Sequence, residues 1–371
     1  MVHPTSSLLP AQQRAIEHVT VHAQSRRAEA LLTQEHIRRM CDIPVDDFRD
    51  ALAVIKRHAR VALHFHPDRP DASGQSVAQA LLRDGCYRSQ FETGLSNGGL
   101  SAHPGGHRDV CEQVLFGGAY HASDASDAAR PKYGALGLLR HADGPSPRFG
   151  SCYLVLRGAV SQRCTFTYLD SHEGAVERGS YDEFDDVFAA LLRSAFCHQL
   201  GLGESGLSVP SLVHRLRAEL PLPVSQLEKF PIARNLDHYI EAQVHGDVLI
   251  GRDVDALVAD PSFRDTTTGG VLEALCQRHE VALHWHSGFV LPCAEVPRNF
   301  RGPTMPSLAE RVARAGIVDA NAIGAAVNDL RANPQAWSDR GSYEDVLQEL
   351  KLLWHVLLKF GKRAAATLEP R

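Results

Sequence analysis

Two short segments of the sequence place a pair of histidines one residue apart behind the same apolar residues. They read VALHFHPDR and VALHWHSGF, and they contain His64 and His66 in the first and His284 and His286 in the second. Because side chains alternate between the faces of a β-strand, the two histidines of each pair would share a face. Neutral imidazole is the commonest metal ligand, so four such rings on neighbouring strands could hold a tetrahedral zinc ion.

Three observations weigh against a metal centre. The obvious carboxylates, Asp68 and Asp170, follow the ends of expected strands, and 20 histidines make a chance His-x-His pair common. The shared residues also do not extend into a longer repeat. One buried, hydrogen-bonded histidine in each pair explains the pattern at least as well. A metal-dependent hydrolase that uses the pairs His64/His66 and His284/His286 is therefore kept only as the alternative function, and we expect no metal.

A stretch rich in glycine, serine, asparagine and proline between residues 84 and 151 suggests a different ligand. Arginines, small hydroxyls, exposed glycine backbone and an aromatic ring suit a molecule that carries phosphates and a ring. Tight turns on a β-rich surface are the plainer explanation, and no Walker or G-x-G-x-x-G motif is present. The candidate ligand-binding residues of this stretch are Gln90, Thr93, Ser96, Asn97, Tyr133, Arg148 and Ser151.

A lone carboxylate, Glu241, stands in the apolar segment YIEAQVHGDVLI. Burial of a carboxylate costs free energy unless the group is paired or used, so this residue is a candidate for catalysis. The alternative is that Glu241 faces solvent on an edge strand.

The elements that must position these residues follow an α+β pattern and not a regular βαβ alternation. Apolar periodicity predicts helices over residues 10–58 and a strand that ends at Pro67. The small residues after Tyr133 are expected to form a turn. Further along the chain we expect strands at 151–160 and 163–170, helices at 181–200 and 209–219, two short strands around Gly246, a short helix at 251–263, a helix followed by a strand at 269–292, and helices after 306.

The composition limits the classes of partner. The 371 residues are 44% hydrophobic and 22% charged with a net charge of −5, which fits a globular protein with a substantial core. The charge gives no general attraction to nucleic acid or an anionic membrane, and apolar runs are too short to span a bilayer. No Sec signal is visible, and eight irregularly spaced cysteines favour buried thiols in a reducing compartment.

Six segments in a fixed order resemble a bacterial family first catalogued as a domain of unknown function. They are HFHPDR, YRSQFETGLSNGG, RPKYGAL, PRFGSCYL, TFTYLDSH and YIEAQVHGDV. The family includes the CteC-type effectors, which are ADP-ribosyltransferases that modify ubiquitin on a threonine. The resemblance covers about residues 60–300. It implies an ADP-ribosyltransferase-like split β-sandwich at residues 59–303, with a helical segment at 1–58 and another at 304–371.

The resemblance also implies roles for particular residues. Glu241 would be the catalytic carboxylate, and His64, His66 or Arg69 on the first core strand would contact the adenosine or phosphates of NAD. The segments that carry serine, threonine and tyrosine would line the nicotinamide cleft. Tyr239 stands two residues before Glu241, where an acidic residue is absent, which argues against an arginine-modifying enzyme and suits a hydroxyl acceptor.

The expected function is therefore NAD-dependent mono-ADP-ribosylation of a threonine in a host protein, by resemblance ubiquitin, which would block ubiquitination. We expect a secreted effector that acts in the host cytosol, or otherwise a protein of the bacterial cytoplasm. A binding module that uses its glycine-rich face is the non-enzymatic alternative. On the main hypothesis the two histidine pairs lie on two strands of one sheet, and His284 and His286 serve mainly to support it.

Overall fold

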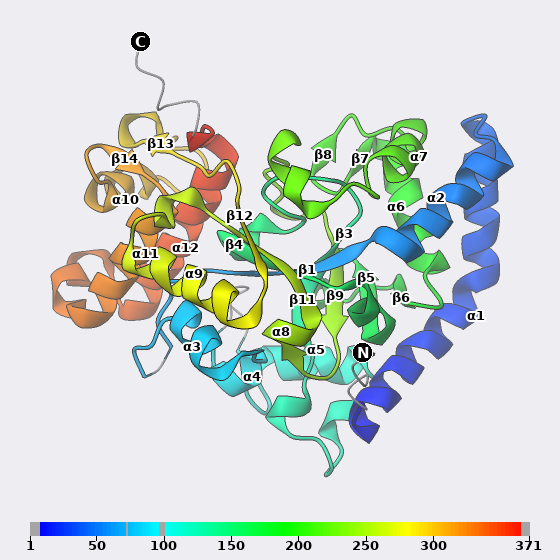
Figure 1. The fold of residues 1–371 in the computed structure, drawn as a ribbon, viewed down its shortest axis with the longest axis horizontal. Helices are drawn as coiled ribbons and strands as arrows, with labels where there is room; N and C mark the ends of the chain where they lie inside the picture. The colour runs from blue at the N-terminus through cyan, green and yellow to red at the C-terminus, as the bar shows by residue number, and fades with distance from the viewer. Residues whose placement is uncertain (1–7, 72, 96–100, 365–371) are drawn as a thin grey trace.

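The computed structural model describes residues 8–71, 73–95 and 101–364, in which eight strands form one central sheet (Figure 1). The strand order is β12-β11-β4-β1-β3-β9-β5-β6, and only β11 and β12 run parallel. The bounds are β1 Arg60–Phe65, β3 Lys132–Gly137, β4 Cys152–Leu156, β5 Cys164–Tyr168, β6 Arg178–Ser180, β9 Ile240–Val244, β11 Val254–Ala259 and β12 Ala282–Trp285. Three strand pairs stand apart: β2 (Cys86–Tyr87) with β10 (Val248–Leu249), β7 (Leu200–Gly201) with β8 (Glu204–Ser205), and β13 (Leu291–Pro292) with β14 (Ile317–Val318).

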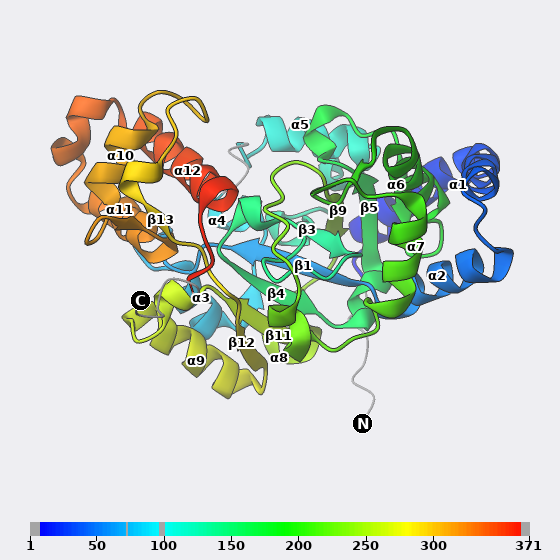
Figure 2. The same ribbon diagram turned by 90° about the horizontal axis from the view of Figure 1, so that it is seen from above.

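Helices gather at the two ends of the sheet and along its surfaces (Figures 1 and 2). At the end formed by β5 and β6 lie α1 (Pro10–Met40), α2 (Val45–His58), α6 (Asp185–His198) and α7 (Val209–Ala218). The C-terminal helices α10 (Met305–Val312), α11 (Ala320–Ala332) and α12 (Tyr343–Phe360) form a group at the opposite end. The other helices are α3 (Val77–Asp84), α4 (Gln90–Thr93), α5 (His107–Leu115), α8 (Ile250–Asp253) and α9 (Thr267–His279). None of the helices in the described ranges is long and apolar enough to cross a membrane.

Short 3₁₀ helices form many of the connections between these elements. They are η1 (Ala119–His121), η2 (Asp127–Ala129), η3 (Pro147–Phe149), η4 (Gly158–Arg163), η5 (Ser171–Glu173), η6 (Val224–Lys229), η7 (Pro261–Phe263), η8 (Cys293–Glu295) and η9 (Pro334–Arg340).

The central strands are covered on both faces, which explains their composition. All five residues of β4 and all five of β9 are buried. Strands buried on both sides read as continuous apolar runs, so a charged residue within one of them is conspicuous. The main hydrophobic core runs from Ile37 to Leu358, across both expected domain boundaries, at residues 58/59 and 303/304.

Most of the expected elements are confirmed. The α+β class, the helices between residues 10 and 58, the strands around Gly246 and the helical C-terminal region all occur in the structure. Gly246 has φ of +78°, a left-handed conformation that glycine adopts at little cost and that lets the chain turn between β9 and β10. The two His-x-His segments do belong to one sheet, in β1 and β12.

Two expected elements were wrong. The short helix predicted at 251–263 is mostly the strand β11, which lies between β4 and β12; an apolar run of six residues does not distinguish a buried strand from a helix. The small residues after Tyr133 form β3 and not a turn. Gly134 allows β3 to approach β1 closely, since a Cβ at this position would lie 2.4 Å from the carbonyl oxygen of Ala62.

Candidate functional site

Glu241 occupies the middle of β9, between β3 and β5. Its backbone lies opposite Ala135 on one side and Thr167 on the other, and only 4% of the residue is exposed. Glu241 is therefore buried on a central strand, and the alternative of a solvent-facing edge residue is wrong.

The Glu241 side chain lines a cavity with an empty volume of about 460 Å³. Its wall combines aromatic rings with polar and charged groups, which is the composition expected for a ligand site. The lining residues are His64, Tyr87, Gln90, Arg108, Tyr133, Gly134, Ser146, Phe149, Asp170, Tyr239 and Glu241.

Arg108 supplies a buried positive charge to this cavity from the first turn of α5. Its guanidinium lies over the ring of Tyr133 at 4.1 Å, and its Nη1 is 3.5 Å from the hydroxyl of Ser171. Its Nε is buried and has no hydrogen-bond partner in the described part of the chain. Burial alone would lower the pKa of Arg108, but the neighbouring Tyr133 and Glu241 outweigh it, and the pKa lies above its usual value.

Asp170 supplies a second carboxylate from the residue just before η5. The hydroxyl of Tyr239 donates to its Oδ2 at 2.7 Å, and the backbone N–H of His172 donates to its Oδ1 at 3.1 Å. The imidazole Nδ1 of His172 is also 2.7 Å from Oδ1. Burial opposes ionisation of Asp170, but these contacts favour the carboxylate and hold its pKa below the usual value.

The pKa values of the two carboxyl groups shift in opposite directions. Burial raises the pKa of Glu241 to about 7, the charge of Asp170 adds to the rise, and Arg108 partly opposes it. Glu241 thus exchanges its proton near neutral pH while Asp170 stays ionised. Two neighbouring acids separated in this way are characteristic of catalytic sites.

A chain of hydrogen bonds between buried side chains holds the Glu241 carboxylate in place. Gln243 donates from Nε2 to Glu241 Oε1 at 2.8 Å, and Thr165 donates its hydroxyl to Gln243 Oε1 at 2.8 Å. The Thr165 oxygen must then accept from His245 Nε2 at 3.0 Å, which leaves His245 Nδ1 to accept from the Tyr120 hydroxyl at 2.5 Å. This buried chain requires neutral His245, whose pKa burial lowers to about 3.

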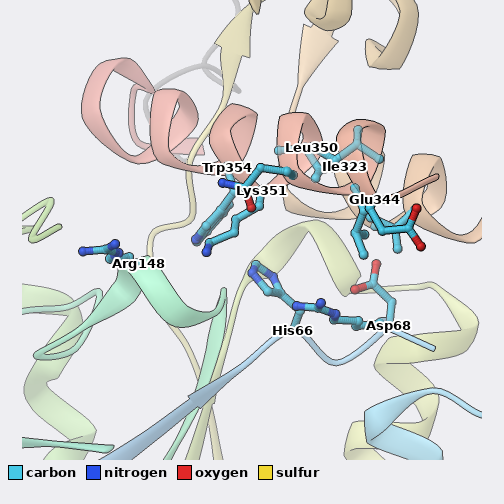
Figure 3. Close-up of a pocket in the computed structure, with 13 residues that line it drawn as sticks. His66, Asp68, Arg148, Ile323, Glu344, Leu350, Lys351 and Trp354 are labelled. Atoms are coloured by element: carbon cyan, nitrogen blue, oxygen red, sulfur yellow. The ribbon is translucent and has the colours of Figure 1, made fainter. Parts of the chain in front are cut away.

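Two further cavities adjoin the Glu241 cavity through shared lining residues, and we call the three together the cleft. The middle cavity shares Tyr87, Gln90 and Tyr133 with the Glu241 cavity. The third cavity, which we call the α12 cavity because residues of α12 line it, shares His66 and Arg69 with the middle cavity. The α12 cavity encloses about 820 Å³ of empty volume, open to solvent. Its labelled residues in Figure 3 are His66, Asp68, Arg148, Ile323, Glu344, Leu350, Lys351 and Trp354.

The structure brings most of the predicted site residues to this cleft. Those that line it are His64, His66, Arg69, Gln90, Thr93, Tyr133, Arg148 and Glu241. Ser151 does not line it: the residue is 3% exposed, and its carbonyl accepts a hydrogen bond from His286. Ser96 and Asn97 lie outside the described residues.

Three of these residues have contacts that define their possible roles. Gln90 Oε1 is buried without a partner in the described ranges, whereas the Thr93 hydroxyl donates to the Ser89 carbonyl at 3.0 Å. Tyr133 has one ring face covered by Arg108, and its hydroxyl donates to a Glu112 carboxylate oxygen at 2.9 Å. Of the three, Gln90 alone offers the cleft an unused polar atom.

The two His-x-His pairs do not converge. His64 lies opposite Tyr153, Tyr153 opposite Val258, and Val258 opposite His284, so the backbones of His64 and His284 are three strand spacings apart, about 14 Å. The His64 ring donates to the Gly150 carbonyl at 3.1 Å and accepts from the N–H of Ser146 at 3.4 Å.

His286 is held in a similar way. Its Nε2 is 3.0 Å from the Ser151 carbonyl, and its Nδ1 accepts from the N–H of Gly288 at 3.0 Å. Across residues 8–71, 73–95 and 101–364, no group of three or more His, Cys, Asp or Glu side chains is arranged to hold a metal ion.

The sequence did not reveal some prominent residues of the cleft. Arg108 lies on α5, a helix that the glycine-rich composition around it concealed, and Lys351 belongs to a helix expected to flank the catalytic region. Gln243 and His245 could have been predicted from the sequence. They follow Glu241 at steps of two residues along a buried strand, and side chains at such steps share a face.

A family model described as "Protein of unknown function (DUF3626)" matches residues 60–360. No curated protein sequence matches the chain.

Proposed function

The chain belongs to the DUF3626 family, and we propose that it is an NAD-dependent mono-ADP-ribosyltransferase. One observation carries the proposal: a buried, hydrogen-bonded glutamate stands at one end of a cleft whose other end gathers His66, Arg69, Arg148 and Lys351. A cleft with a carboxylate at one end and cations at the other suits a ligand that joins a sugar to phosphates. The resemblance of the ordered motifs to CteC-type effectors suggests the same activity.

The chemistry needs one ionised carboxylate beside the sugar. When the bond between C1′ of the ribose and the nicotinamide nitrogen breaks, the electron pair leaves with nicotinamide and positive charge develops on the ribose. Glu241, held by Gln243, would stabilise that charge and hold the ribose 2′-hydroxyl. The acceptor hydroxyl oxygen then bonds to C1′ and releases its proton to solvent.

The walls of the Glu241 cavity suit nicotinamide. Tyr87, Tyr133, Phe149 and Tyr239 provide aromatic surface. Gln90 Oε1, a buried acceptor without a partner in the described ranges, could accept a hydrogen bond from the nicotinamide carboxamide.

The sheet offers support for an ADP-ribosyltransferase-like split β-sandwich at residues 59–303. Strands β1 and β3 are joined by only three residue pairs, from Arg60/Gly137 to Ala62/Ala135. Beyond that junction His64 on one strand and Gly134 on the other both line the Glu241 cavity. The sheet would thus divide into the four strands from β12 to β1 and the four from β3 to β6, with the substrate between them.

For the acceptor, the proposal names a threonine hydroxyl of a host protein, and by resemblance this protein is ubiquitin. Tyr239, two residues before Glu241, donates its hydroxyl to Asp170, so no carboxylate comes from this position to orient a guanidinium. The proposed setting is that of a bacterial effector which blocks ubiquitination in the host cytosol.

Labelling with NAD tests the proposal directly. The full chain is incubated with adenylate-labelled NAD and either purified ubiquitin or a eukaryotic lysate, and the labelled product is identified by mass spectrometry. We expect ADP-ribose on a threonine of ubiquitin and release of nicotinamide, with neither produced by Glu241→Gln. Absence of both NAD consumption and protein labelling would refute the assignment, and label on another protein would change the acceptor only.

A further inference from the structure

The α12 cavity contains a lysine that the protein leaves without a partner. Lys351 projects from α12 toward His66, with Trp354 beside it (Figure 3). No hydrogen bond or ion pair joins its ammonium group to the described part of the chain, and Lys351 is only partly exposed. A partly buried ammonium group with no acceptor is unfavourable unless an anion accompanies it.

Other cations surround this lysine. Arg69 and Arg148 line the same cavity, and the charge of Arg301 also acts on Lys351. Burial lowers the pKa of Lys351 to about 8, and the charges of Arg148, Arg69 and Arg301 contribute to the change. Like charges brought together in this way are stabilised when a ligand of opposite charge enters.

Polar atoms without partners near Lys351 point to the same conclusion. Arg148 Nε, Arg301 Nε and both ring nitrogens of His355 are buried and have no hydrogen-bond partner in the described ranges. His355 is 1% exposed, and it stands one turn after Lys351 on α12, within the field of Arg301, Arg148 and Lys351. Buried polar groups without partners are rare in folded proteins, and Arg148, which lines the α12 cavity, thus has a donor for which an acceptor is missing.

The acidic residues of the cavity stand on its other side. Figure 3 shows Asp68 and Glu344 together, away from Lys351 and Arg148. Burial raises the pKa of Asp68 to about 7, so its negative charge is reduced at neutral pH. Arg148 is paired through Nη1 with Asp237 at 2.6 Å, whereas Lys351 has no carboxylate partner in the described ranges, so the side of the cavity at Lys351 is the electropositive one.

We propose that α12 builds a diphosphate subsite, in which Lys351, Arg69 and Arg148 bind the two phosphates of a nucleotide. Phosphate oxygens accept charge-assisted hydrogen bonds from guanidinium and ammonium groups, and a diphosphate provides enough acceptors for all three. That the ligand is NAD rests on the proposed function; the anion site itself rests on the cations of the cavity. The helix expected to flank the catalytic region thus supplies part of the ligand site.

Binding measurements on the full chain test the subsite without any turnover. Inorganic pyrophosphate, ADP-ribose and nicotinamide are titrated separately by calorimetry into the wild-type protein, Lys351→Gln and Lys359→Gln. Lys359 is the matched control because it lies on the same helix but is exposed. We expect Lys351→Gln to weaken pyrophosphate and ADP-ribose binding by ten-fold or more, and Lys359→Gln to stay within two-fold. Lys351→Arg should retain binding within a few-fold, and nicotinamide binding should not change in any variant.

The outcomes separate this subsite from the proposed function. Pyrophosphate and ADP-ribose binding that depends on Lys351, without NAD consumption, would uphold the subsite and refute the transferase. NAD consumption that Lys351→Gln leaves unchanged in KM, with unchanged ADP-ribose binding, would overturn the subsite and keep the transferase. Lys351-dependent binding of pyrophosphate but not of ADP-ribose would uphold the subsite with free diphosphate as its ligand. Thermal unfolding is measured in parallel, and Lys351→Met provides a second uncharged variant if Lys351→Gln does not fold.

Discussion

Gln243 donates a hydrogen bond from Nε2 to Oε1 of Glu241 at 2.8 Å, and the two residues are two positions apart on β9. Their side chains share a face of the strand, so the contact depends on β-geometry that the sequence itself dictates. Thr165 on the neighbouring strand β5 and His245, the residue after β9, continue this chain of hydrogen bonds. Residues of the sheet thus set the orientation of the Glu241 carboxylate, and a bound ligand is not needed to orient it.

Replacement of Glu241 by glutamine should abolish turnover while NAD still binds. The introduced amide would have the same shape but no charge to stabilise the developing positive ribose, and loss of such electrostatic stabilisation costs about 10²–10³ in kcat. The measurement is nicotinamide release with and without ubiquitin, together with a Kd for NAD. Activity within a few-fold of the wild type would contradict the role of Glu241.

The activity should increase with pH around neutrality. The proposed step needs ionised Glu241, whose pKa lies at about 7, so kcat/KM for NAD should rise between about pH 6 and pH 8 and then level. A profile that is flat across this range, or that falls, would show that the ionised form is not the active one.

The stability of the protein should change with pH in the opposite direction. The folded-state pKa of Glu241 lies above its unfolded value of 4.5, so the folded protein holds this proton more tightly. The resulting stabilisation is complete below about pH 4.5 and is lost as pH rises through about 7.

Glu241→Gln should therefore raise the melting temperature relative to the wild type more at pH 8 than at pH 5. The exposed Glu310 provides the control, because Glu310→Gln should shift the melting temperature equally at both pH values. Equal shifts for Glu241→Gln as well would contradict the raised pKa.

Gln243 should act as a positioning residue. Gln243→Leu removes the donor to Glu241 and leaves the Thr165 hydroxyl without its acceptor, so we expect kcat to fall by about ten-fold with little change in KM for NAD. The midpoint of the pH profile should also move upward, since a hydrogen bond to the ionised carboxylate is lost. A general loss of stability would lower the amount of folded enzyme but would not move that midpoint. Gln335→Leu, on the exposed surface, should change neither quantity.

The two histidine pairs should respond differently to substitution. His66→Ala and Arg69→Ala are expected to raise KM for NAD, because both residues line the cleft. His286→Ala removes hydrogen bonds to the backbone at Ser151 and Gly288, and it should destabilise the fold by about 1–3 kcal/mol with KM unchanged. Denaturant unfolding and NAD kinetics on the same preparations separate the two effects. A KM for NAD raised by His286→Ala in folded protein would contradict this division.

The sequence predicted the site best where chemistry and strand geometry coincide. Glu241 stood out because a charge within an apolar strand has few structural explanations, and the structure places it at a cavity. His64 was singled out as well, but both of its ring nitrogens are used by the backbone, a detail that residue spacing does not encode.

Other residues of the cleft could not be predicted because they depend on tertiary packing. Arg108 and Lys351 are single cations on helices, and nothing in their local sequence distinguishes them from solvated surface residues. They reach the cleft only because α5 and α12 pack beside it. The error at β11 has a similar origin, since a short apolar run is assigned correctly only when its neighbours β4 and β12 are known.

The contact between α12 and His66, the residue after β1, has a consequence for the order in which the cleft is assembled. The His66 ring packs edge-on against Trp354, whose indole donates to the Pro147 carbonyl at 3.0 Å, so the last helix closes a cleft begun by the first strand. A chain still attached to the ribosome has β1 long before it has α12. Its cleft therefore lacks one wall and Lys351 until α12 has been synthesised and has packed against the sheet.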